Sequence, residues 1–90
     1  MKKSFYSSSV NSFKNSEDNS ILGELVRNNT FELNELQKTS WIKQISILKD
    51  NFKELNRGHI LFEYSIPRMG KRADTVLLLD GLVFVLEFKV

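Results

Sequence analysis

Hydrophobic positions recur at helical spacing through the first two thirds of the chain. In residues 20–28, neighbouring apolar pairs one turn apart form a stripe: Ile21, Leu22, Leu25 and Val26. Gly23 interrupts this stripe at a cost of about 1 kcal/mol relative to Ala, which indicates close packing there. A longer stripe lies in residues 34–56: Leu36, Trp41, Ile45, Leu48, Phe52 and Leu55. Asn34 is a suitable N-cap before this stripe, and Arg57 and Gly58 are a suitable stop after it. These stripes predict helices at about 20–28 and 34–56.

The last third changes to a pattern rich in β-branched, aromatic and leucine residues. Three such runs, at about 59–67, 72–79 and 82–90, are separated by the turn sequences PRMGKR and DG. They predict three consecutive antiparallel strands, and "LVFVLEFKV" at residues 82–90 is so apolar that it predicts a strand buried on both faces. The predicted class is α+β, with two or three N-terminal helices followed by a three-stranded meander.

Composition adds an N-terminal arm and excludes several protein classes. Residues 1–20 contain seven Ser and three Asn, so residues 1–7 are predicted to be a flexible arm and residues 8–90 a single domain. Tyr6, Val10 and Phe13 predict a short helix at about 9–15, capped by Ser8 or Ser9. The chain has no cysteine, no stretch of ~18 apolar residues and no apolar core of a signal peptide. These absences predict a cytoplasmic protein that does not enter a membrane.

The Asp80-Gly81 turn sets the register of the last hairpin and brings charges together. If these residues are the central pair of a type I′ turn, Asp74 lies opposite Glu87, with Cβ atoms roughly 5 Å apart. Lys89 then points to the same face as Glu87. Opposed carboxylates destabilise a sheet unless a divalent cation binds between them, and oxygen ligands suit Mg²⁺ or Mn²⁺. The alternative is an ordinary solvent-facing edge strand, in which charges two residues apart are common.

Two further features lie in the first hairpin. With Met69 and Gly70 as its central pair, Glu63 faces Val76 and is a weaker candidate acid on the face of Asp74. A basic turn surrounds this hairpin tip and is either a phosphate clamp, a solvated tip or a source of neutralising charge for the carboxylates: Arg68, Lys71 and Arg72.

Asp74, separated by twelve residues from Glu87-Phe88-Lys89, resembles the signature of the PD-(D/E)XK nuclease superfamily. The runs at 21–49 and 62–90 are also similar to the N-terminal nuclease-like region of uncharacterised bacterial Schlafen-like ATPase proteins. The resemblance implies a restriction-endonuclease-like core that cleaves nucleic acid, DNA rather than RNA. It implies that Asp74, Glu87 and the Phe88 carbonyl bind Mg²⁺ or Mn²⁺, that Lys89 activates water, and that Glu24 supplies a further acid.

The same resemblance leads us to expect a longer parent protein. The superfamily core continues beyond its E-x-K strand, whereas this chain stops at Val90, so we expect a partial domain followed by an ATPase or helicase domain. The open strand edge implies self-association or a partner strand. Two alternatives stay open: a non-catalytic nucleic-acid-binding or interaction module, and a winged-helix DNA binder with a basic hairpin tip.

Overall fold

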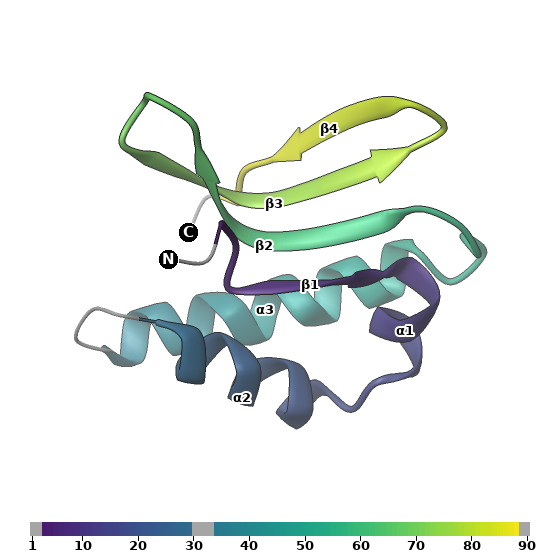
Figure 1. Cartoon of the computed structure of the whole chain (residues 1–90). Coiled ribbons are helices and arrows are strands. Elements are labelled where there is room, and N and C mark those ends of the chain that lie inside the picture. Colours follow the sequence, from purple (N-terminus) through teal and green to yellow (C-terminus); the bar gives the residue numbers. More distant parts are fainter. Residues whose placement is uncertain (1–2, 30–33, 89–90) are drawn as a thin grey trace.

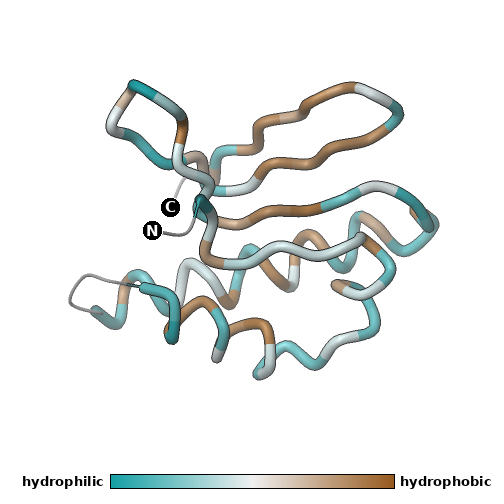
Figure 2. The backbone as a smooth tube through the Cα atoms, viewed as in Figure 1, coloured by the Kyte–Doolittle hydropathy of each residue, from teal (hydrophilic) through white to brown (hydrophobic). Residues whose placement is uncertain are grey.

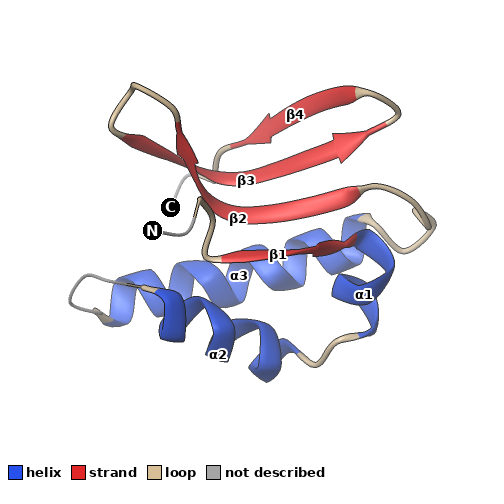
Figure 3. Ribbon diagram, in the orientation of Figure 1, coloured by secondary structure: helices blue, strands red, loops and turns tan. Residues whose placement is uncertain are grey.

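The computed structural model describes residues 3–29 and 34–88, which form a four-stranded antiparallel sheet with three helices packed on one side (Figures 1 and 3). The strands are β1 (Tyr6–Ser9), β2 (His59–Ile66), β3 (Lys71–Leu79) and β4 (Leu82–Leu86), in that order across the sheet. The helices are α1 (Val10–Asn15), α2 (Asp18–Asn28) and α3 (Glu35–Asn51). The predicted mixed class and the meander of β2, β3 and β4 are confirmed, but a strand was missed at the N-terminal side.

β1 corrects the prediction of a flexible arm over residues 1–7 at its C-terminal part, while residues 1 and 2 lie outside the described residues. Tyr6 and Ser7 pair with Phe62 and Leu61 of β2, and the Phe5 amide donates to the Phe62 carbonyl at 2.9 Å. Phe5 and Tyr6 are both buried. Burial of two aromatic side chains, each worth about 1.5–3 kcal/mol, outweighs the preference of the serine-rich composition for disorder.

The helices begin and end close to the predicted residues. Ser9 caps α1 by accepting from the Ser12 amide at 3.1 Å, and Asn34 caps α3 by accepting from the Gln37 amide at 2.8 Å. α2 begins at Asp18 rather than residue 20. α3 ends at Asn51, not residue 56, because the Asn51 side chain donates to the Ile47 carbonyl and the chain then turns toward β2.

One hydrophobic core lies between the sheet and the helices. Its centre is Phe62, whose ring is 5.8 Å from that of Tyr6 and 5.7 Å from that of Phe13. α3 contributes Trp41, Ile45 and Leu48 as predicted. The predicted stripe is wrong at its first position, however, because Leu36 is 81% exposed.

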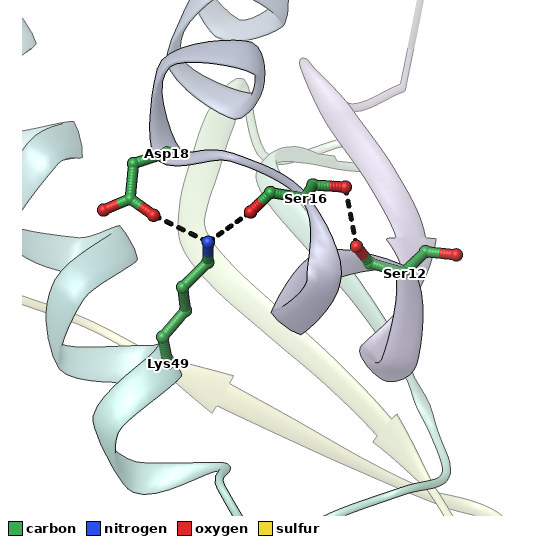
Figure 4. A network of polar contacts seen from close by, with 4 residues as sticks. All are labelled: Ser12, Ser16, Asp18 and Lys49. Carbon is green, nitrogen blue, oxygen red and sulfur yellow. Dashed lines mark hydrogen bonds and ion pairs between the residues drawn. The ribbon is translucent and has the colours of Figure 1, made fainter.

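A polar network holds α1, α2 and α3 together at their ends (Figure 4). Lys49 of α3 donates to Asp18 Oδ1 at 2.6 Å and also to the backbone carbonyl of Ser16, between α1 and α2. The Ser16 hydroxyl donates in turn to the Ser12 carbonyl at 2.6 Å. Lys49 therefore contributes to helix packing, and its ammonium group is already engaged.

β4 is the most exposed strand of the sheet, contrary to the predicted burial on both faces. Figure 2 shows hydrophobic residues along both β3 and β4. Yet the β4 side chains remain between 42% and 65% exposed: Leu82, Val83, Phe84 and Val85. The strand also ends at Leu86 rather than at residue 90. A continuous apolar run predicts burial, but β4 is the last strand of the described sheet and the helices lie under the other strands (Figure 1).

Gly23 does not mark close packing, which leads to a stability prediction. A Cβ at Gly23 meets no atom within 4 Å, so Gly23→Ala is expected to raise the free energy of unfolding by up to about 1 kcal/mol through helix propensity. Gly58→Ala is the matched control, because Gly58 has φ +103° and its Cβ would lie 3.0 Å from the Leu78 carbonyl oxygen. Urea unfolding should show a gain for the first variant and a loss for the second, and a loss for both would contradict this account of α2.

Candidate functional site

The Asp80-Gly81 turn forms as predicted and fixes the last hairpin. Asp80 and Gly81 have φ values of 53° and 78°, as a type I′ turn requires. The predicted register is confirmed from Leu79↔Leu82 to Thr75↔Leu86. The next pair in this register is Asp74 with Glu87, one position beyond the end of β4.

At that position the backbones of Asp74 and Glu87 do not pair, and the Asp74 side chain contacts the following backbone instead. Asp74 Oδ2 accepts a hydrogen bond from the Phe88 amide at 2.9 Å. Partial desolvation raises the pKa of the Glu87 carboxyl above its usual value, and the charge of Asp74 and hydrogen bonding between the two carboxyl groups raise it further. Asp74 and Glu87 therefore lie close together, as the turn register predicted.

The first hairpin differs from its prediction and brings a third acid to the cluster. Its loop comprises residues 67–70, and Ile66 pairs with Lys71, so Val76 faces Leu61 rather than Glu63. Glu63 lies between the pairs Phe62↔Thr75 and Tyr64↔Ala73, which places it across from Asp74. The longer loop shifts the register by two residues, and Glu63 becomes a stronger candidate than the sequence indicated.

Glu63 has an unusual backbone conformation for a residue inside a strand. Its φ is +54°, in the left-handed region, which costs a non-glycine residue on the order of 1 kcal/mol. Two contacts hold it there: Trp41 Nε1 donates to Glu63 Oε2 at 3.3 Å, and Arg72 donates to the Glu63 carbonyl at 2.9 Å. The side chain is thereby directed toward α3. Strain of this kind concentrates at functional sites.

The pKa of Glu63 depends on the two other acids, Asp74 and Glu87. Burial raises the pKa of the Glu63 carboxyl, and the charges of Asp74 and Glu87 raise it further. The Trp41 hydrogen bond and the charge of Arg72 act in the opposite direction. The charges of Glu63, Asp74 and Glu87 thus disfavour one another. The described ranges 3–29 and 34–88 nevertheless hold no three acidic, histidine or cysteine side chains that could bind one ion.

The other predicted site residues lie elsewhere or beyond the described chain. Glu24, on α2, lines a separate cavity beside Lys3, Phe5 and Asn28. Phe88 contacts the site through its amide, while its side chain packs against the core. Lys89 falls outside the described residues, so its predicted role with water remains a prediction.

The basic turn divides into two kinds of residue. Arg68 and Lys71 are exposed at the hairpin tip, and Arg68 has φ +67°. Arg72 is half-buried, and its guanidinium carbon lies 4.4 Å from the centroid of the Phe5 ring. The charge of Arg72 lowers the pKa of the Glu63 carboxyl, which is consistent with the third of the roles considered for this turn.

Sequence reasoning missed the part that Trp41 plays at the site. Trp41 was predicted only as a core residue, and it is indeed buried, but its indole N–H also fixes the Glu63 carboxylate. A buried tryptophan needs a hydrogen-bond acceptor for its indole N–H, and the register of β2 places Glu63 there. A tryptophan on the predicted buried face of α3 was therefore the feature of the sequence that could have indicated this contact.

The pKa values of Glu63 and Glu87 predict how stability depends on pH. Because both are raised in the folded chain, the folded state retains protons that the unfolded state has released. The free energy of unfolding should therefore fall as pH rises from the ordinary glutamate pKa through the raised values. Asp80 affects stability at lower pH, because the hydrogen bond from Arg57 lowers the pKa of its carboxyl. The stabilisation from this hydrogen bond is lost only as pH falls through that lowered pKa.

Urea unfolding between about pH 4 and about pH 8 measures this fall. Glu63→Gln, which keeps an acceptor for Trp41, should show a smaller fall than the wild type. The exposed Glu54→Gln should show the same fall as the wild type. Stability that rises with pH across this range in the wild type would contradict the described clustering of the acids.

Comparisons with known proteins assign no family. No protein-family model matches the chain, and no curated protein or solved structure resembles it significantly. No helix of the described residues is long and apolar enough to cross a membrane. The function must therefore be argued from the site.

Proposed function

We propose that the chain is a metal-dependent nuclease-type domain that hydrolyses phosphodiester bonds, in DNA rather than RNA. The observation that carries the proposal is the placement of Asp74 and Glu87 one step beyond the β3–β4 ladder, with Glu63 across from Asp74. Uncompensated repulsion between carboxylates is costly in a fold of this size, and a bound cation relieves it.

The residues present fit a magnesium ion. Mg²⁺ is commonly bound through one or two carboxylates, with water and substrate phosphate oxygens filling its remaining positions, so Asp74 and Glu87 suffice. When bound, the ion would lower the pKa of water and shield phosphate charge. Asp74, which accepts a hydrogen bond from the Phe88 amide, and Glu87 would hold the ion. Glu63 would accept a proton or orient water from the neighbouring strand.

The experiment is cleavage of a labelled DNA strand by the 90-residue chain with Mg²⁺, Mn²⁺ or EDTA. Cleavage that requires the metal supports the proposal. Cleavage unaffected by EDTA, or absent with both metals at every protein concentration, would overturn it for this chain.

A non-catalytic nucleic-acid-binding module is the second candidate. One observation favours it: an Asp74 oxygen already accepts a hydrogen bond from the Phe88 amide, and the described residues hold no group of three acidic, histidine or cysteine side chains that could bind one ion. This candidate predicts salt-dependent DNA binding that survives Glu87→Ala without cleavage. The winged-helix interpretation depended on a two-stranded hairpin, and the four-stranded sheet does not favour it.

A further inference from the structure

A polar cavity of about 290 Å³ lies beside the acidic cluster, where the first turns of α3 meet β2 and β3. In Figure 3, the start of α3, the start of β1 and the β2–β3 hairpin lie at the same end of the molecule. Asn34, Gln37 and Trp41 line the cavity from α3 and its cap, and Phe5, Glu63 and Arg72 line it from the sheet side. Glu63 therefore belongs both to this cavity and to the acidic cluster.

The cavity offers both donors and acceptors of hydrogen bonds. The Gln37 backbone amide is already capped by Asn34, but the Gln37 side chain brings an amide donor and an amide acceptor into the lining. The Glu63 carboxylate, with one oxygen bonded to Trp41, adds an acceptor. Amide and carboxylate groups of this kind bind the edges of nucleobases, which also carry both donors and acceptors.

Arg72 gives the cavity a planar group. The Phe5 ring lies 4.4 Å from the guanidinium carbon, and the bond from Arg72 to the Glu63 carbonyl fixes the guanidinium further. A guanidinium plane held in this way stacks against an unpaired base. Glu63 disfavours a phosphate group in the same cavity, because its carboxylate repels an anion.

We propose that this cavity binds one unpaired nucleobase of a single-stranded nucleic acid and thereby positions the strand beside Asp74 and Glu87. The inference rests on the proposed function for its biological use, but the binding itself needs no metal. A base must be unpaired to enter, because its hydrogen-bonding edge faces the cavity wall. Glu63 lines the cavity and lies across from Asp74, so a base bound there would bring its strand next to the acidic cluster.

The chain carries its own probe, because Trp41 is the single tryptophan and its indole N–H bonds to a cavity residue. We would titrate the 90-residue chain in EDTA with single-stranded ten-nucleotide DNA, with the same sequence as a duplex, and with inorganic phosphate, following Trp fluorescence. The single strand is expected to give a saturable change that the duplex and phosphate do not give.

Gln37→Ala and Gln37→Glu should each weaken single-strand binding about fivefold to tenfold, through loss of the amide contact. Thr39→Ala is the control, because Thr39 is exposed on the same helix and lines a different cavity, and it should bind like the wild type. Gln37→Glu keeps side-chain length and helix propensity, so it reports on the cavity even if Gln37→Ala folds poorly.

The results separate this inference from the proposed function. A fluorescence change without metal-dependent cleavage supports the base site and removes the nuclease proposal. Metal-dependent cleavage without a fluorescence change, equal binding of single strand and duplex, or unchanged affinity in both Gln37 variants would overturn the base site.

Discussion

The Asp74→Asn substitution is expected to lower Mg²⁺-dependent cleavage at least about 100-fold, because it removes the charge of a proposed metal ligand. The fold should persist, since an asparagine oxygen still accepts the hydrogen bond that Asp74 takes from the Phe88 amide at 2.9 Å. The variant should also show a lower pKa for Glu87, because the charge of Asp74 contributes to the present rise. Cleavage rates and the carboxyl titration of Glu87 by NMR measure the two effects.

Asp50→Asn is the matched control for this experiment. It makes the same change of one charge on the exposed surface of α3, where Asp50 forms an ion pair with the exposed Lys53 at 3.0 Å. Its cleavage rate should stay within about twofold of the wild type, since exposed pairs contribute little. An equal loss in both variants would mean that net charge, and not the site, controls cleavage.

The Phe62→Ala substitution is expected to remove about 3–5 kcal/mol from the free energy of unfolding. A 90-residue domain holds about 5–13 kcal/mol in total, so the variant should be partly or wholly unfolded near 37 °C. The effect is large because Phe62 is fully buried between the rings of Tyr6 and Phe13. Its loss therefore weakens the core contacts of Tyr6 in β1 and Phe13 in α1.

Phe84→Ala tests whether the loss of stability depends on burial of the phenylalanine or on the loss of any phenylalanine ring. Phe84 lies on β4 and is 42% exposed, so the same truncation should cost at most about half as much. Urea unfolding followed by circular dichroism measures both variants. Equal losses would contradict the description of β4 as the exposed strand of the sheet.

The sequence predicted the parts of the fold that depend on local chemistry. Asp80-Gly81 determined a turn type, and the turn determined the register from Leu79↔Leu82 to Thr75↔Leu86. Asn34 predicted the start of α3 through its capping preference. Each of these depends on two to four neighbouring residues, so no tertiary information was needed.

The errors arose where distant contacts decide the outcome. The serine-rich start hides β1, which forms because Phe5 and Tyr6 reach a core assembled from β2 and α1. The length of the 67–70 loop was not determined by its residues, so the register of Glu63 was wrong by two positions. Burial of β4 was overestimated because a continuous apolar run does not say what packs against it.

Of the candidate site, the proximity of Asp74 and Glu87 was predictable from the sequence and the position of Glu63 was not. That proximity follows from the register of one turn, whereas the position of Glu63 depends on a loop length, a left-handed φ of 54° and a hydrogen bond from Trp41. Glu24 was assigned through a family resemblance alone, and the structure places it in another cavity.

The most direct test of the central claim is a Mn²⁺ titration of the chain followed by NMR, because bound Mn²⁺ broadens the signals of nearby nuclei. We expect the amides of Glu63, Asp74, Glu87 and Phe88 to broaden first, and Mg²⁺ to reverse the broadening by competition. Asp74→Asn should weaken the effect at all four residues. Broadening that spares these amides, or that is equal in Asp74→Asn, would contradict a metal site built on the β3–β4 hairpin.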